Sequence, residues 1–309
     1  MVANGGRCPK KAGSLNSGKE ESCCAEKAQV VHELRQSYHV VALLKVVGLL
    51  RSTFYAWDNA RKTPEKHAQA KELIKEIYDE HKGRYGYRRI KTALSERGVD
   101  LHENTVLRLM GQLKLKSLQR VKRFKSYKGN VGVVAPNLLL RDFSASAPFE
   151  KLATDVTEFK LGDIKLYLST IKDLFNREIV AYEMGLRPTM EMVNSMLKKA
   201  LVKLKPGQTP TLHSDQGWHY QMPDYRKLLS DHNVVQSMSR KGNCLDNASM
   251  ESFFAVLKTE CFHKQKFADI DALKATIHEY IEYYNTKRIS NVLGGLSPLQ
   301  YRLRRTQAA

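Results

Sequence analysis

Residues 152–159 read Leu-Ala-Thr-Asp-Val-Thr-Glu-Phe, the pattern of a strand buried in the middle of a sheet, with Asp155 inside it. Two further runs rich in β-forming residues follow at 165–172 and 178–185. Helical and strand signals then alternate: a helix capped by Thr189 over 189–204, a strand at 211–213, a helix over 224–231, a strand at 234–237, and helices over 248–262 and 271–287. This order predicts an α/β fold in which helices flank a mixed five-stranded sheet, as in RNase H-like architectures.

The chain ahead of residue 148 has the periodicity of helices. Short helices at 40–47 and 52–59 predict a helix-turn-helix, with an ordinary helical hairpin as the alternative. The expected division of the chain is a disordered leader (1–28), a helix-turn-helix (30–60), a second module of the same kind (68–116), a basic linker (117–147), an α/β domain (148–290) and a C-terminal extension (291–309).

The net charge of the chain and its distribution indicate which class of molecule it binds. The chain carries 51 Lys and Arg against 32 Asp and Glu, a net charge of +19. Residues 81–128 hold 14 basic and 3 acidic side chains, a concentration typical of nucleic-acid binding. The candidate DNA contacts are Arg51, Ser52, Thr53 and Tyr55 at the start of the second short helix, and Arg84, Arg88, Arg89, Lys91 and Arg108, which are expected to lie on the outside. A solvated basic face is the alternative for the second group.

The apolar pattern excludes a membrane span of ordinary length. The longest apolar stretch, residues 40–50, is interrupted by Lys45 and falls short of the roughly 20 residues that a spanning helix needs. We therefore expect a cytoplasmic protein.

Three carboxylates occupy informative positions: Asp155 inside a strand, Asp215 just after a strand, and Glu251 in the first turns of a helix. A carboxylate in a buried strand is costly unless it is paired or binds a cation. On the helix over 248–262, Glu251 and Lys258 lie two turns apart beside the apolar stripe. Carboxylates without a cluster of His or Cys suit Mg²⁺ or Mn²⁺, and two such ions can activate a nucleophile against a phosphodiester. A surface position is the alternative for Glu251.

The chain closely resembles the OrfB transposases of the IS-three family of bacterial insertion sequences, which are integrase-like DDE transposases. The resemblance spans about residues 30–303, and its motifs are Tyr85-Gly86-Tyr87-Arg88-Arg89-Ile90, Ala135-Pro136-Asn137-Leu138-Leu139, Thr154-Asp155-Val156-Thr157-Glu158, His213-Ser214-Asp215-Gln216-Gly217, the long run Gln236 to Ala248, Glu251-Ser252-Phe253-Phe254 with Lys258, and Leu296-Ser297-Pro298-Leu299-Gln300-Tyr301-Arg302. The chain departs from the family pattern at Leu152, where Trp is usual, and at residues 291–295.

The resemblance implies an RNase H-like integrase catalytic core at 148–290. Asp155, Asp215 and Glu251 would form its metal-binding catalytic triad, with Lys258 near the substrate phosphates. It also implies Mg²⁺- or Mn²⁺-dependent cleavage of the element's DNA ends and their transfer to a target during DNA transposition and integration. A homo-oligomer on the terminal inverted repeats, an OrfA partner or frameshift fusion, and a location at the bacterial nucleoid are implied in the same way.

Two features refine this hypothesis, and two other functions stay open. Arg240 and Lys241 are expected to clamp DNA from the loop over 239–246, to which Gly242 lends mobility.

A DNA-binding regulator with an inert C-terminal domain would have no use for three carboxylates. A host nuclease or Holliday-junction resolvase of the RNase H type would cut without regard to the terminal sequence.

Overall fold

The computed structural model describes residues 17–62, 67–118, 134–240, 243–263 and 265–307. The chain forms two compact units, Met1–Ala70 and Lys71–Ala309. In the described residues, no single helix is long and apolar enough to cross a membrane; α2 and α3 pass such a test only as a pair bent by 111°.

The first unit is built from three helices: α1 (Ser17–Leu34), α2 (Val40–Val47) and α3 (Arg51–Lys62). Its core joins Ala28 and Val31 of α1 to Leu44 of α2 and Phe54 of α3. Helix α2 ends at Gly48, whose φ of 66° is the left-handed conformation that glycine adopts readily at a helix end. The expected turn between two short helices is present there.

The second unit contains all but the first residues of a helical module, defined here as α4 (Ala68–Glu80), α5 (Tyr87–Glu96) and α6 (Glu103–Gln112). The apolar stripes predicted for these helices are buried, with Ile74, Ile90 and Leu109 among the least exposed side chains. The module covers most of the segment expected to form a second DNA-binding element.

A five-stranded sheet forms the centre of the second unit, in the order β3-β2-β1-β4-β5. Its strands are β1 (Lys151–Leu161), β2 (Ile164–Asp173), β3 (Ile179–Gly185), β4 (Thr211–Ser214) and β5 (Val235–Met238). The first three strands pair antiparallel, and β4 and β5 add to β1 in parallel. The predicted mixed five-stranded sheet is confirmed, with β1 as its central strand.

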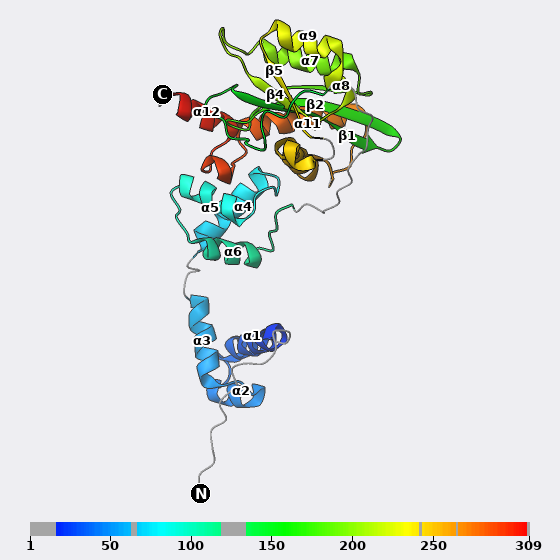
Figure 1. The fold of residues 1–309 in the computed structure, drawn as a ribbon. Helices are drawn as coiled ribbons and strands as arrows, with labels where there is room; N and C mark the ends of the chain where they lie inside the picture. Colours follow the sequence, from blue (N-terminus) through cyan, green and yellow to red (C-terminus); the bar gives the residue numbers. More distant parts are fainter. Residues whose placement is uncertain (1–16, 63–66, 119–133, 241–242, 264, 308–309) are drawn as a thin grey trace. The chain divides into compact units, whose positions relative to one another are not determined.

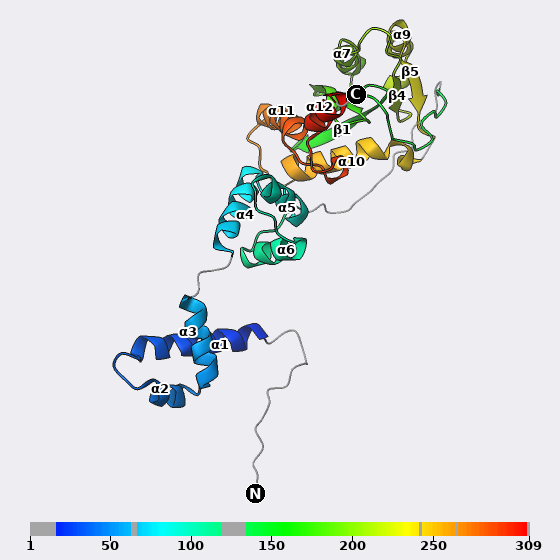
Figure 2. The same cartoon turned by 90° about the vertical axis from the view of Figure 1, so that its left-hand side faces the viewer.

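Helices cover both faces of this sheet (Figure 1, Figure 2). The helices of the domain are α7 (Met190–Leu201), α8 (Trp218–Gln221), α9 (Pro223–Asp231), α10 (Ala248–Leu257), α11 (Ile270–Thr286) and α12 (Pro298–Gln307). Residues of β1 alternate between the two faces: Leu152 packs with α7 and α9, whereas Ala153 and Phe159 pack with α10 and α11. This alternation places Asp155 on the face covered by α10 and α11.

Several expected boundaries were wrong. Residues 17–28, expected to belong to a disordered leader, form the first part of α1, while residues 1–16 lie outside the described part of the chain. Residues 17–28 include the good helix formers Glu, Lys and Ala, and their helix propensity explains why a helix forms in a segment that has no apolar stripe. The helix expected over 248–262 ends at Leu257 and continues as a π-helical turn, Lys258–Phe262. Helix α12, in the C-terminal extension, was not anticipated. Most of the expected basic linker, residues 119–133, also lies outside the described residues.

Candidate active site

The three predicted carboxylates come from three elements that the sheet brings to one region. Asp155 lies in the middle of β1, Asp215 follows the last residue of β4, and Glu251 is in the first turn of α10. Strands β1 and β4 are parallel neighbours, so the residue after β4 and the middle of β1 lie toward the same end of the sheet. Helix α10 packs against β1 and brings Glu251 to the same face.

Asp155 experiences the charges of both other carboxylates. Burial raises its pKa well above the usual range, and the charges of Asp215 and Glu251 raise it further. Its side chain accepts hydrogen bonds from the backbone N–H of Val156 at 2.7 Å and from Nδ2 of Asn247 at 3.1 Å. A carboxylate that is desolvated and surrounded by negative charge is strongly stabilised by a nearby cation.

Asp215 is held by a tight turn in which Gly217 leaves room for its carboxylate. Its Oδ1 accepts a hydrogen bond from the backbone N–H of Gly217 at 2.8 Å. A Cβ atom at position 217 would lie 2.8 Å from that same oxygen, closer than real Cβ contacts are. Partial exclusion of water raises the pKa of Asp215, although the residue lies at the surface. The turn therefore fixes the carboxylate, and Gly217 makes its position possible.

Lys258 brings a positive charge to this region. Burial lowers its pKa, and the negative charges of Glu158 and Asp155 act in the opposite direction. Its Nζ lies 5.4 Å from the centre of the Phe159 ring, within cation–π range. It is the first residue of the π-helical turn, a feature that is rare in proteins and frequent at functional sites.

The loop that precedes α10 is organised by a buried carboxylate. Asp246 accepts hydrogen bonds from the guanidinium groups of Arg240 and Arg141 and from Nδ2 of Asn137. The hydrogen bond from Arg240 holds the pKa of Asp246 far below its usual range, despite burial, and Arg141 adds to the effect. Arg240 thus has an intramolecular partner, so its expected role as a DNA clamp stays a prediction, and Lys241 lies outside the described residues. The loop was singled out from the sequence, but Arg141, which binds Asp246 from about 100 residues upstream, was not.

The donor set fits a hard divalent cation. The three acids supply carboxylate oxygens, and Oδ1 of Asn247, buried beside Asp155, has no hydrogen-bond partner among the described residues. Carboxylate and amide oxygens are the ligands that Mg²⁺ and Mn²⁺ prefer. In the described part of the chain, no three His, Cys, Asp or Glu side chains are grouped closely enough to form a preassembled metal cluster. The acids thus influence one another electrostatically without forming a closed cage.

Comparison with known proteins decides the family. Residues 145–244 and 251–305 match family models described as integrase core domain, and residues 65–123 match one described as HTH-like domain. The chain is 52% identical over 274 residues to the InsK transposase of insertion sequence element IS150 of Escherichia coli (strain K12), which covers 89% of this chain and 97% of that protein. It is 33% identical over 279 residues to transposase InsF for insertion sequence IS3A of the same organism, covering 88% and 96%. The chain belongs to the insertion-sequence transposases with an integrase core.

This membership confirms the resemblance found in the sequence, and it makes the chain an enzyme of DNA cleavage and strand transfer. Among solved structures, the catalytic core domain of HTLV-2 integrase in complex with magnesium (trimeric form) aligns with 51% of the transposase and 98% of that chain. The TM-score is 0.40 and the sequence identity is 16%.

The candidate DNA contacts of the transposase divide into exposed and buried groups. Exposed residues include the four at the start of α3, which are Arg51, Ser52, Thr53 and Tyr55, together with Arg88 and Arg108 of the helical module. Lys91 is half-buried. The expectation that Arg84 lies on the outside was wrong: it is buried and stacks on the rings of Tyr280 and Tyr283. Arg89 is half-buried and donates to the backbone oxygen of Arg84.

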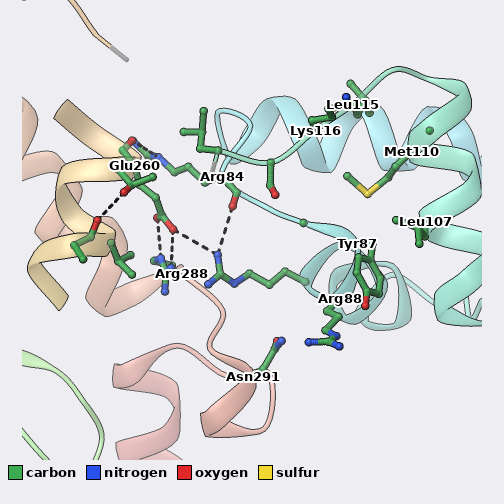
Figure 3. A pocket seen from close by; sticks show the side chains of 18 of the residues that line it. Arg84, Tyr87, Arg88, Leu107, Met110, Leu115, Lys116, Glu260, Arg288 and Asn291 are labelled. Carbon is green, nitrogen blue, oxygen red and sulfur yellow. Dashed lines mark hydrogen bonds and ion pairs between the residues drawn. The ribbon is translucent and has the colours of Figure 1, made fainter. Parts of the chain in front are cut away.

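Glu260 is the centre of a buried network that joins the helical module to the integrase core (Figure 3). Arg288 donates to both of its carboxylate oxygens, at 2.6 and 2.8 Å, and the hydroxyl of Tyr280 donates to it at 2.9 Å. From the module, Arg89 approaches to 3.6 Å, and Nε of Arg84 donates to the backbone oxygen of Glu260. Burial alone would raise the pKa of Glu260, but Arg288 outweighs it and the pKa is lowered. Glu260 and Arg288 were not singled out from the sequence.

Proposed function

We propose that Asp155, Asp215 and Glu251 are the catalytic residues of this transposase and bind the divalent metal that DNA cleavage and strand transfer require. The observation that carries the proposal is the electrostatic convergence on Asp155 of two acids that are 60 and more residues away in the sequence. Burial and the charges of the two other acids raise the pKa of Asp155, so its ionised form is costly unless a cation lies beside it. A trio of like charges in one region suits a site whose partner is a cation.

Mg²⁺ or Mn²⁺, expected as two ions, would lower the cost of deprotonating the attacking water or 3′-hydroxyl and stabilise the leaving oxygen of the phosphodiester. Residues of the chain itself orient the carboxylates for this chemistry. Asn247 orients Asp155 through the hydrogen bond to its Oδ2, and the turn at Gly217 orients Asp215. Lys258, whose ammonium is partly desolvated, would hold a non-bridging oxygen of the DNA backbone near Asp155.

The remaining parts of the transposase would bring the DNA to this centre. The segment that matches an HTH-like domain, residues 65–123, carries 15 Lys and Arg against 8 Asp and Glu and would bind the terminal inverted repeats. Arg88 and Arg108 are exposed there and would contact phosphates. We further propose a homo-oligomer on DNA, which would hold two ends and a target, and an OrfA partner or fusion, as the resemblance to OrfB transposases implies. Because its substrate is DNA, we propose that the protein acts in the bacterial cytoplasm, at the nucleoid.

The test measures cleavage and joining of oligonucleotides that carry the element's ends, with Mg²⁺ or Mn²⁺. Asp155→Asn, Asp215→Asn and Glu251→Gln are each expected to abolish both reactions while DNA affinity stays within a few-fold of the wild type. Glu183→Gln is the matched control, since Glu183 is a half-buried carboxylate of β3 that binds Lys199 and Ser195. Near-normal cleavage by any of the three variants would refute its catalytic role.

The same assay separates the other functions considered from the sequence. A DNA-binding regulator would bind the ends and never nick them, whatever the metal. A structure-selective nuclease would cut scrambled ends as fast as cognate ends, whereas a transposase is expected to prefer cognate ends.

A further inference from the structure

A small cavity lies between α10, the β2–β3 connection and the segment that follows α11. Its volume is about 210 Å³, below the roughly 300–1,000 Å³ of pockets that enclose drug-sized ligands. Four of its lining residues are cationic, namely Arg89, Lys172, Arg177 and Arg288, and none is acidic. Ser252, Ser290 and Asn291 supply neutral hydrogen-bonding groups to the same walls. The cavity thus has the size and donor set for one small anion.

Lys172 is the least expected of these groups. It belongs to the central part of the sheet and is 4% exposed, and its Nζ donates to the backbone oxygen of Ser249 at 3.1 Å. Burial lowers the pKa of Lys172 to about 7, and the positive charges of Arg177 and Arg288 contribute to the decrease. Within the described part of the chain, no carboxylate forms an ion pair with Lys172 or Arg177.

The positive charge in this cavity exceeds what Glu260 can compensate. Glu260 binds Arg288 directly and Arg89 at 3.6 Å, so one negative charge serves two arginines from outside the cavity. In the described part of the chain, no such carboxylate partner compensates the charges of Lys172 and Arg177, and Glu260 neutralises the charge of Arg89 only in part. Of these, Lys172 is buried without a carboxylate partner among the described residues, so an anion in this position would favour its charged form and stabilise the folded protein.

The cavity is accessible and adjoins the proposed catalytic helix. Arg177, Asn291 and Val292 are exposed and form its rim, while Lys172, Tyr284 and Arg288 are buried at its floor. Ser252, which lines it, follows Glu251 directly in α10. Arg89, Ser252 and Asn291 also line a larger pocket of about 690 Å³ between the helical module and α10, shown in Figure 3. A chain of nucleotides that reached Glu251 along α10 would pass this rim.

We propose that this cavity binds a phosphate group of the DNA backbone, held by Lys172, Arg177 and Arg288 one helix face away from Glu251. The inference rests on the proposed function insofar as the phosphate belongs to DNA. A phosphate fits the site better than a carboxylate does, because it presents several oxygens to donors that converge from three elements. The contact would anchor the strand without taking part in the bond-breaking step.

Two binding measurements on the full chain test the site without using catalysis. In the first, the thermal midpoint is compared in sodium phosphate and in sodium chloride of equal ionic strength. Phosphate is expected to raise the midpoint of the wild type, and Lys172→Met is expected to lose at least half of that rise. Lys203→Met is the matched control, because Nζ of Lys203 also donates to a backbone oxygen, that of Val180, but does not line the cavity.

In the second measurement, the affinity for an end-bearing duplex is followed against salt concentration by fluorescence anisotropy. Loss of one phosphate contact should weaken binding about tenfold near 0.1 M salt and reduce the slope of log K against log [salt] by about 0.9. Arg177→Gln is a second test variant whose exposed side chain makes a folding defect a poor explanation of the result.

Each outcome bears on the proposal. If Lys172→Met responds to phosphate like the wild type, the cavity binds no phosphate and the proposal is wrong. If Lys172→Met loses the response to phosphate but its slope of log K against log [salt] for DNA equals that of the wild type, the site binds free phosphate and the assignment to DNA is wrong. Both results are independent of whether Asp155→Asn abolishes cleavage, so failure of this site and failure of the proposed catalytic centre are distinguishable.

Discussion

Replacing the buried carboxylate of Glu260 gives the most direct test of how the helical module and the integrase core are held together. Glu260 and Arg288 each have side chains that are 8% exposed, and they form two hydrogen bonds of 2.6 and 2.8 Å. Glu260→Gln removes the charge and leaves Arg288 buried without its counter-ion. Removing one partner of a buried ion pair costs about 3–5 kcal/mol.

This cost predicts a large change in thermal stability. For a unit of roughly 240 residues, 1 kcal/mol corresponds to about 2–4 °C, so Glu260→Gln should lower the midpoint by roughly 6–20 °C. Glu80→Gln is the matched control, because Arg97 binds Glu80 at the same 2.6 Å while Glu80 is 54% exposed. An exposed pair contributes at most about 1 kcal/mol, so this control should lose less than about 4 °C.

The same pair predicts a dependence on pH. Because the pKa of Glu260 is lowered in the folded state, its contribution is complete above the unfolded value of about 4.3 and is lost as the pH falls through the folded value. The difference between wild type and Glu260→Gln, followed by circular dichroism melts, should therefore be constant near pH 7 and shrink below about pH 4. Equal losses for Glu260→Gln and Glu80→Gln at pH 7 would refute the reasoning.

Three further predictions concern the catalytic face and its surroundings. Gly217→Ala should reduce strand transfer by about tenfold to a hundredfold without changing the affinity for DNA, because its Cβ would displace Asp215; unchanged turnover in the oligonucleotide assay would contradict this. Asp246→Asn should increase proteolysis of the loop before α10, since two arginines lose their shared counter-ion, and a digestion pattern equal to that of the wild type would argue against it. The stability of the wild type relative to Lys172→Met should rise between pH 7 and about 10, because the unfolded state binds the proton of Lys172 more strongly than the folded state; a flat difference in melting midpoints over that range would show that burial does not lower the pKa of Lys172.

The sequence predicted the sheet and the catalytic candidates because both have local signals. Strand β1 alternates between two buried faces, and Asp155 is conspicuous there as a charged side chain in an otherwise buried segment. Thr189 was recognised as a helix cap, and its hydroxyl does accept the backbone N–H of Met192. The positions of Asp215 and Glu251 followed from the ends of neighbouring elements.

What the sequence did not predict depends on partners far along the chain. Arg84 was expected on the outside because its neighbours are basic, yet aromatic rings of α11, about 200 residues downstream, cover it. The π-helical turn at Lys258–Phe262 has no periodicity that distinguishes it from an α-helix. Glu260 lies within this turn, and its two arginine partners are Arg89 of α5 and Arg288, just after α11. Side-chain charge alone could not reveal whether such a residue is solvated or buried.

Helix α10 and its π-helical turn connect these observations in one segment. One face, with Phe253 and Leu257, packs into the core, and a second presents Glu251 and Lys258 toward Asp155. A third face borders the two cavities through Ser252 and, in the turn, meets the helical module through Glu260. Lys258 lies two residues before Glu260 in the same π-helical turn. The buried network therefore joins the helical module to the segment that carries Glu251 and Lys258.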